Sequence, residues 1–400
     1  MIGWFQAVAS SGMLSVNYAP LYRSFTERFA FSTGLISWSQ MQESIDNFRA
    51  RTGGNLTTSS TGYLKNSTAA LLTRQLSIGT NSSTTGSGDL IPSNITRSLG
   101  IEAYVEQTGI VQENAFMTVF LIACIVILAI IVSVLLFKVI LEIWDLCGKY
   151  PKSLIGFRKH YWGTIFRTNV ILINTFYGIW VLYSIHQFRV GDSWAATLLA
   201  ALTLAVFSGI LIFFAVGIFR AANHHIKYSG SAARLFEDKK IWLKYGLLYN
   251  TYRKKTWWFF TPSILYNCIR YALIAALSGR GLAQTVSVLI VEVSMLILVI
   301  FLHPFERKRE NFVHILTHIV RALLSGAILV FVDELKVQRS TQTIMGFALV
   351  IITSVLTVLL VGLLVFNAIY VCCKDNPHRK RRKEAGTPPC YSNQSMRPIC

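Results

Sequence analysis

Residues 115–137 read AFMTVFLIACIVILAIIVSVLLF, an apolar stretch without a charged side chain. The hydrocarbon core of a bilayer is about 30 Å thick, and about 20 helical residues cross it. Since no water is present there to bind backbone groups, such a stretch must form an α-helix, whose hydrogen bonds stay within the segment. This stretch decides the fold class, because it predicts a chain that is built into a membrane.

Six further stretches have a similar length and composition, so we expect about seven transmembrane helices within a domain that covers residues 115–371. They are 169–188, 193–219, 257–277, 282–302, 311–332 and 343–371. Over all 400 residues, 53% are hydrophobic and 14% are charged, compared with about 25% charged residues in a soluble protein. The sequence therefore predicts an all-α polytopic membrane protein that follows a lumenal or extracellular N-terminal region.

The loops between these helices predict the orientation of the chain. Loops 138–168, 220–256 and 303–310, together with the tail 372–400, hold 25 Lys and Arg but only 8 Asp and Glu. Residues 1–114 are balanced, with 7 basic and 7 acidic side chains. Basic loops stay on the cytoplasmic side of a membrane. We therefore expect a basic cytoplasmic tail and a lumenal or extracellular N-terminal region, and the net charge of +19 needs no nucleic acid partner.

The N-terminal region divides into two parts by composition. Residues 1–48 are rich in aromatic side chains and predict a membrane-proximal segment, whereas residues 49–114 form a Ser/Thr-rich loop. That loop holds four glycosylation sequons, at Asn55, Asn66, Asn81 and Asn94. No signal peptide follows Met1, so either the first span is a reverse anchor or a front end is missing from the chain, which is the interpretation we favour.

Three charged residues fall inside the predicted spans and mark the candidate functional site. Glu292 and Arg321 lie near the middle of the fifth and sixth spans, and Arg270 lies slightly outward in the fourth. An isolated charge at the bilayer midplane costs about 2.5–3.5 kcal/mol on insertion scales, so we expect these side chains to face inward and pair. His314 and His318 extend the polar face of the sixth span.

Two interpretations of these five residues remain open. In the first, they line a polar cavity that conducts ions or holds an anionic substrate, with histidines able to titrate near neutral pH. In the second, the carboxylate and the arginines form a structural bridge that fixes helix packing, since buried charges can serve specificity alone.

Other chemistry has little support in the sequence. Motifs for nucleotide hydrolysis, metalloproteases and serine hydrolases are absent, so we expect neither an enzyme nor a metal site nor a bound cofactor. Cys372 and Cys373 precede the basic run 379–383 and are candidates for palmitoylation beside anionic lipids of the cytoplasmic leaflet.

Four stretches resemble the fungal TRP-like family, which comprises flavin-carrier and polycystin-related membrane proteins. They are GMLSVNYAP at 12–20, TGGNLT at 52–57, KYGLLY at 244–249, and HPF at 303–305 with RKREN at 307–311. The resemblance covers nearly the whole chain. It implies a fungal multi-span protein of the endoplasmic reticulum or cell surface, associated with FAD import into the lumen, calcium homeostasis and cell-wall maintenance. Family members also have a signal peptide and an ML-like domain, which are not found here.

Three functions follow as hypotheses. The first is a transport protein that carries FAD as its substrate, and the second is a TRP-like cation channel. The third is a scaffold or lipid-sensing protein that does not transport and that presents its basic loops and tail to anionic lipids.

Overall fold

The computed structural model describes residues 1–54, 99–146, 161–229, 234–237 and 245–373. Within these ranges the chain is helical, and strand-like pairing is confined to an isolated bridge between Tyr252 and Phe305. The predicted all-α fold is therefore confirmed. The chain divides into two compact units, Ile2–Thr353 and the part that follows from Ser354.

Six helices in the described residues are long and apolar enough to cross a membrane. They are α6 (Ala115–Leu146), α8 (Tyr161–Val190), α9 (Trp194–Ser229), α13 (Gly281–Leu302), α14 (Lys308–Ile328) and α15 (Arg339–Cys373). The remaining predicted span, the fourth (257–277), corresponds to α12 (Phe260–Ala276), a helix of 17 residues. It is shorter than predicted because its first turn is the separate 3₁₀ helix η5 (Trp257–Phe259).

Shorter elements precede and connect these helices. They are α1 (Ile2–Ser11), α2 (Pro20–Glu27), η1 (Ala30–Thr33), α3 (Ser39–Arg51), α5 (Ile101–Gln107), η3 (Gln112–Asn114), α10 (Arg234–Glu237), η6 (Leu329–Phe331) and η7 (Asp333–Leu335). The four sequon asparagines and the basic run 379–383 lie outside the described residues. Cys372 and Cys373 form the last residues of α15.

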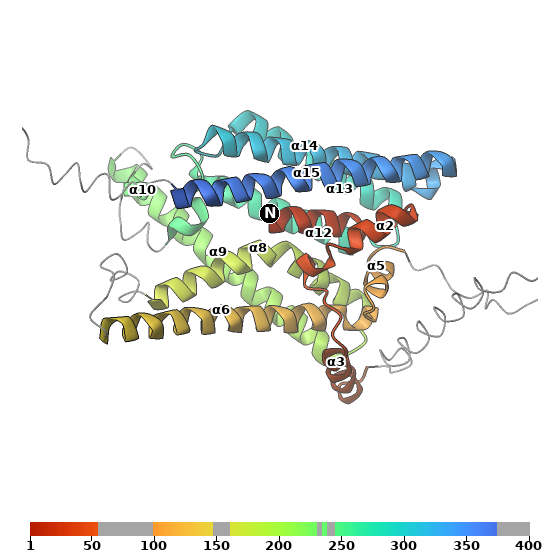
Figure 1. Ribbon diagram of the computed structural model, residues 1–400, viewed down its shortest axis with the longest axis horizontal. Coiled ribbons are helices and arrows are strands. Elements are labelled where there is room, and N and C mark those ends of the chain that lie inside the picture. Colours follow the sequence, from red (N-terminus) through yellow and green to blue (C-terminus); the bar gives the residue numbers. More distant parts are fainter. Residues whose placement is uncertain (55–98, 147–160, 230–233, 238–244, 374–400) are drawn as a thin grey trace, which may run out of the picture. The chain divides into compact units, whose positions relative to one another are not determined.

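Helix α8 packs against α6, α9 and α12 (Figure 1). About 44% of its apolar stretch is buried within the protein, compared with 6% for α6. Its polar groups therefore find partners on other helices: the Trp180 Nε1 group donates to Thr203 Oγ1 at 3.2 Å, and Tyr177 OH lies 3.0 Å from Ser208 Oγ. This central position explains why α8 is less apolar than the lipid-facing spans.

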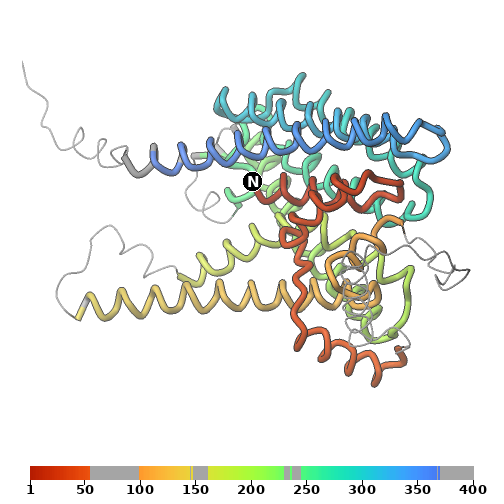
Figure 2. Tube along the Cα trace, turned by 45° about the vertical axis from the view of Figure 1, so that its right-hand side comes forward, coloured from red at the N-terminus to blue at the C-terminus, as the bar shows by residue number. Residues whose placement is uncertain are grey.

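Helix α13 packs between α12 and α14, to which short turns connect it (Figure 2). It ends at Leu302 because His303 adopts a left-handed conformation, with φ of 41°, and Pro304 cannot continue a helix. Asn311 then closes the turn, since its side chain accepts from the Phe305 N–H at 3.0 Å and donates to the Phe305 carbonyl at 2.7 Å. These contacts give a structural role to the HPF motif and to the asparagine that follows it.

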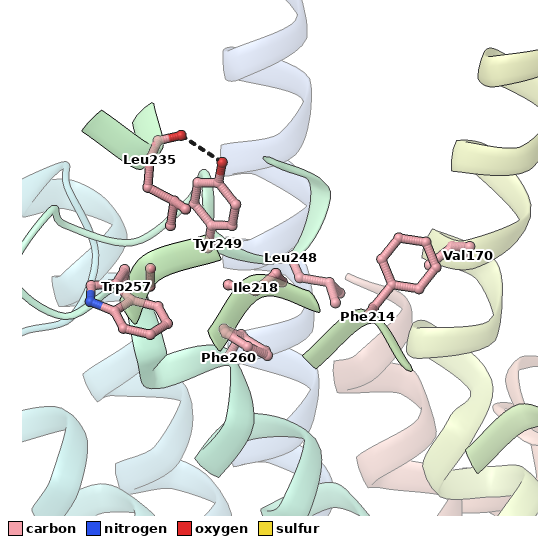
Figure 3. Packing of buried hydrophobic residues seen from close by; sticks show 9 residues of the cluster. Val170, Phe214, Ile218, Leu235, Leu248, Tyr249, Trp257 and Phe260 are labelled. Carbon is pink, nitrogen blue, oxygen red and sulfur yellow. Dashed lines mark hydrogen bonds between the residues drawn. The ribbon is translucent and has the colours of Figure 1, made fainter. Parts of the chain in front are cut away.

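A buried hydrophobic cluster holds part of loop 220–256 against the helices (Figure 3). Leu235 of α10 and Tyr249 are fully buried in it, and the Tyr249 hydroxyl donates to the Leu235 carbonyl at 2.8 Å. Phe214 and Ile218 of α9 supply the opposite side. The apolar side chains in this part of the loop are therefore used for packing within the protein.

The contact between α8 and α12 requires a glycine. A Cβ atom added to Gly178 would overlap the ring of Tyr271, which lies directly on the α8 backbone. Tyr271 is itself buried, and its neighbour Arg270 belongs to the charged cluster described below. The position of α12 beside α8 therefore depends on the absence of a side chain at residue 178.

Replacing Gly178 with alanine should lower the free energy of unfolding by about 1–3 kcal/mol, the usual cost of overpacking a core. The matched control is Gly209→Ala in α9, where an added Cβ would meet no atom within 4 Å. Reversible unfolding in mixed detergent micelles measures both variants. Equal stability of the two would contradict the tight packing at Gly178.

Candidate functional site

The candidate site centres on the Glu292 carboxylate, which is fully buried on α13. Arg270 on α12 donates from Nε to Glu292 Oε1 at 2.7 Å. Arg321 on α14 approaches the same oxygen with Nε at 3.2 Å and Nη2 at 3.1 Å. The Tyr266 hydroxyl donates to the other oxygen, Oε2, at 2.7 Å. Side chains from α12 and α14 thus converge on one carboxylate of α13.

Helical spacing brings these groups to Glu292. Tyr266 and Arg270 are four residues apart on α12, so they share the face that packs on α13. Glu292 is eleven residues from the start of α13, or about 17 Å at 1.5 Å per residue. The cluster therefore lies about halfway along a helix that is long enough to cross the membrane.

The two histidines of the predicted polar face have different surroundings. His318 lies next to the cluster: its Nδ1 atom is 3.7 Å from Glu292 Oε2, longer than a hydrogen bond, and its ring meets the Tyr266 ring edge-on at 5.5 Å. His314 lies one turn earlier on α14, where its ring stacks on Phe305 at 3.9 Å. The structure thus gathers Glu292, Arg321, Arg270 and His318, and it places His314 at the α13–α14 turn.

The N-terminal helix α1 forms another wall of the site. Arg270 donates from Nη1 to Ser10 Oγ at 3.0 Å and from Nη2 to the Ala7 carbonyl at 3.5 Å. This contact was not predicted from the sequence, because residues 1–48 indicated a membrane-proximal segment and Ile2–Ser11 carries no charged side chain. The only signal was the serine pair at positions 10 and 11, at the end of an apolar run.

The GMLSVNYAP stretch holds α1 in this position. Ser15 binds the turn between α12 and α13 and the first turn of α13. Its N–H donates to Gln284 Oε1 at 2.7 Å, and its Oγ accepts from the Gly279 N–H at 2.8 Å. At the end of α1, Ser11 Oγ lies 2.8 Å from the Tyr22 hydroxyl. Burial raises the pKa of Tyr22 to about 12, so this hydroxyl keeps its proton for the hydrogen bond.

Little empty space remains within the cluster. The cavity between α1 and the charged side chains has a volume of about 10 Å³ and is lined by Trp4, Ala7, Arg270, Glu292 and Arg321, among others. That volume is near the minimum that holds one water molecule. The site is therefore closed in this conformation, and passage of any solute requires the surrounding helices to separate.

A second buried charge network lies among α3, η3 and the turn between α8 and α9. Arg49, which is 1% exposed, donates from Nε to Asp192 Oδ2 at 2.7 Å and from Nη1 to Asn114 Oδ1 at 2.8 Å. Asn114 in turn donates to Asp46 Oδ1 at 2.8 Å. This network fixes α3 to the start of α6. Sequence reasoning missed it because Arg49 lies within a polar stretch, where a charged side chain needs no partner.

Comparison with known proteins decides the family. The profile described as Transient receptor potential (TRP) ion channel matches residues 1–388. The chain belongs to this TRP family. The resemblance seen in its four sequence stretches is thereby confirmed.

Relatives of this TRP-family chain are fungal. It is 23% identical to Flavin carrier protein 2 of Saccharomyces cerevisiae over 94% of the chain and 50% of the relative. It is 25% identical to TRP-like ion channel protein flc1 of Cryptococcus neoformans, over 98% of the chain and 56% of the relative. Flavin carrier protein 1 of Saccharomyces cerevisiae is 24% identical over 94% of the chain and 48% of the relative.

These names describe carriers or a channel and not enzymes, and with the spanning helices they identify an integral membrane protein. The chain spans about half the length of the relatives it matches. No solved structure matches it.

Removal of the buried carboxylate tests the energetics of the cluster. Glu292→Gln leaves two guanidinium groups without a counter-charge and should lower the free energy of unfolding by about 3–5 kcal/mol. The matched control, Glu306→Gln, changes an exposed glutamate and should stay within about 0.5 kcal/mol of wild type.

Adding Arg321→Met to Glu292→Gln should restore part of the loss, because one of the two unpaired charges is removed. Unfolding in mixed micelles measures all three variants. A Glu292→Gln variant as stable as Glu306→Gln would contradict the charge pairing.

Proposed function

We propose that this protein is a membrane transporter that moves an anionic nucleotide, FAD, into the lumen of the endoplasmic reticulum. The observation that carries the proposal is the charge of the buried cluster, where the guanidinium groups of Arg270 and Arg321 face the carboxylate of Glu292. Among the described residues, these two guanidinium groups and one carboxylate give the cluster a net charge of +1 halfway along the spans. Charged side chains at this depth mark substrate or ion pathways in many membrane proteins.

The choice of FAD rests on the names of two relatives, which are called flavin carriers. The pyrophosphate of FAD is an anion that arginine side chains bind well. A role in calcium homeostasis and cell-wall maintenance belongs to the same proposal, through the family resemblance. His318, next to Glu292 Oε2, is the titratable group that we assign to this pathway; His314 completes the polar face of α14.

A cation channel is the second candidate function. It is favoured by the family profile and by the relative named as a TRP-like ion channel protein. In that case the Glu292 carboxylate is the group that attracts a cation once Arg270 or Arg321 moves away. The two candidates predict opposite effects of the arginines: they attract the substrate of a carrier, and they repel the ion of a channel.

The basic loops support contact with anionic lipid at the cytoplasmic face. Arg253 donates from Nε to the Phe305 carbonyl at 2.9 Å, and its N–H donates to the Pro304 carbonyl at 2.8 Å. These bonds bring the basic stretches 253–255 and 307–309 to the same turn. Acylation of Cys372 and Cys373 would add a second membrane anchor beside the basic tail. The third hypothesis, a scaffold function, is supported only by these basic stretches and the basic tail.

Opening of the pathway requires α1 to separate from α12, because Arg270 bonds to Ser10 and Ala7 across the closed cavity. Ser10→Ala removes one hydrogen bond to a charged group, worth about 1.5–3 kcal/mol. We therefore expect the substitution to increase the transport rate at least several-fold, since it destabilises the closed conformation. Uptake of FAD by reconstituted proteoliposomes measures this rate.

The matched control is Ser44→Ala, which changes an exposed serine that bonds within its own helix α3. It should leave the uptake rate unchanged. Calcium flux, measured in the same proteoliposomes, separates the two candidates: FAD uptake without calcium flux supports the carrier, and the reverse supports the channel. Absence of both fluxes in wild type and in Ser10→Ala would reject transport and leave the scaffold.

The proposed orientation, with the N-terminal region in the lumen, predicts glycosylation before α6. Asn55, Asn66, Asn81 and Asn94 should each accept a glycan in a eukaryotic host, so endoglycosidase treatment should increase gel mobility. Replacing all four with glutamine should abolish that shift. Asn393, whose sequon lies in the tail, should stay unmodified; a glycan there would contradict the orientation.

A further inference from the structure

A separate pocket lies between α6 and α8, with a volume of about 140 Å³. Helix α6 contributes Val119, Ile122 and Ala123, and α8 contributes Ile179 and Trp180. The 3₁₀ helix η1 and the residues after it border the pocket, and Phe207 of α9 closes it behind Trp180, with ring centroids 4.7 Å apart. The pocket shares no lining residue with the Glu292 cluster.

The polar groups at the pocket already have partners. Thr33 is the single lining residue with a hydroxyl, and it donates to the Ala30 carbonyl at 2.8 Å and lies 3.3 Å from the Tyr183 hydroxyl. The Trp180 indole N–H donates to Thr203. A polar ligand would lose its bonds to water here and find none in return, which costs several kcal/mol on an alkane scale. The walls therefore select a hydrocarbon ligand.

The position of the pocket along α6 indicates where a hydrocarbon ligand comes from. On α6 it reaches from Val119 to Ile127, about 6–18 Å beyond the start of the helix. The residues at its opening are apolar and exposed: Phe31 is 57% exposed, Ile36 42% and Val126 36%. Because α6 is long and apolar enough to span the membrane, the medium outside this opening is the acyl-chain region of the bilayer. A ligand enters sideways from the lipid.

The volume limits the ligand to a few carbon atoms. An apolar cavity of about 150 Å³ in another protein holds one benzene molecule, so 140 Å³ holds a short run of methylene groups. The fused rings of a sterol are rigid and larger. We propose that this pocket binds one acyl chain of a membrane phospholipid, against Ala123 of α6 and Trp180 of α8.

A bound chain also adds apolar contacts to α8. Ile179 and Trp180 directly follow Gly178, where α8 meets Tyr271 of α12. A ligand that binds only the folded protein raises its stability. Added phospholipid should therefore raise the unfolding temperature of the protein in detergent.

The experiment uses the full chain in detergent with phosphatidylcholine that carries a diazirine on one acyl chain, at a ratio near one lipid per protein. After illumination, mass spectrometry should find the label on 119–127 of α6 and 172–180 of α8, above the level on the following stretch 128–136, which does not line the pocket. Excess unlabelled phosphatidylcholine should remove the label from the first two segments. An even distribution of label along α6 would overturn the proposal.

Paired variants test the pocket itself. Ala123→Phe places a ring in the pocket and should reduce the labelling several-fold and abolish the rise in unfolding temperature. Ala129→Phe adds the same ring on the exposed side of α6 and should behave like wild type. Equal labelling of the two folded variants would overturn the proposal.

A photoactivatable cholesterol that labels the pocket while phosphatidylcholine does not would also overturn it, in favour of a sterol site. If Ala123→Phe does not fold, the competition by unlabelled phosphatidylcholine in wild type decides the outcome.

Discussion

A charge cannot remain in hydrocarbon without a partner, and this constraint organises the middle of the molecule. Glu292 meets it through Arg270 and Arg321, each on a neighbouring helix. The tyrosine hydroxyl on α12 binds the second carboxylate oxygen. Three helices are thereby held at one depth, and the fourth wall, α1, follows because Arg270 has donors left over that Ser10 and Ala7 accept. Removal of the Glu292 carboxylate leaves two guanidinium charges uncompensated in a medium that cannot solvate them.

The same arrangement accounts for the closed cavity at the cluster. The cluster is closely packed around the Glu292 carboxylate, and its cavity of about 10 Å³ leaves no passage. The transport that we propose needs a second conformation in which water or substrate replaces the bonds between α1 and α12. The GMLSVNYAP stretch, which follows α1, is bound to Gln284 and Gly279 at one end of α13. This links the family's sequence motif to the site.

Helix α8 is held by close packing of small and apolar side chains. Close approach of α8 and α12 depends on Gly178, since small residues let helix backbones meet where no hydrophobic effect drives them together. On the opposite side of α8, packing with α6 is incomplete and leaves the apolar pocket. The two features lie in adjacent turns, so the helix that carries much of the buried area also has an opening to lipid.

The sequence by itself determined that the chain is an all-α membrane protein of the TRP family, because apolar length and the order of short motifs are local properties. It also indicated that Glu292, Arg321 and Arg270 should meet, because the cost of a buried charge is known before any contact is seen. Only the tertiary structure showed that α1 completes the cluster and that His314 stacks on Phe305. It also revealed that Arg49 is buried and that an apolar pocket opens beside α6. Those features depend on which helix faces come together, and residues such as Ser10, Arg49 and Ala123 look ordinary until a distant segment packs against them.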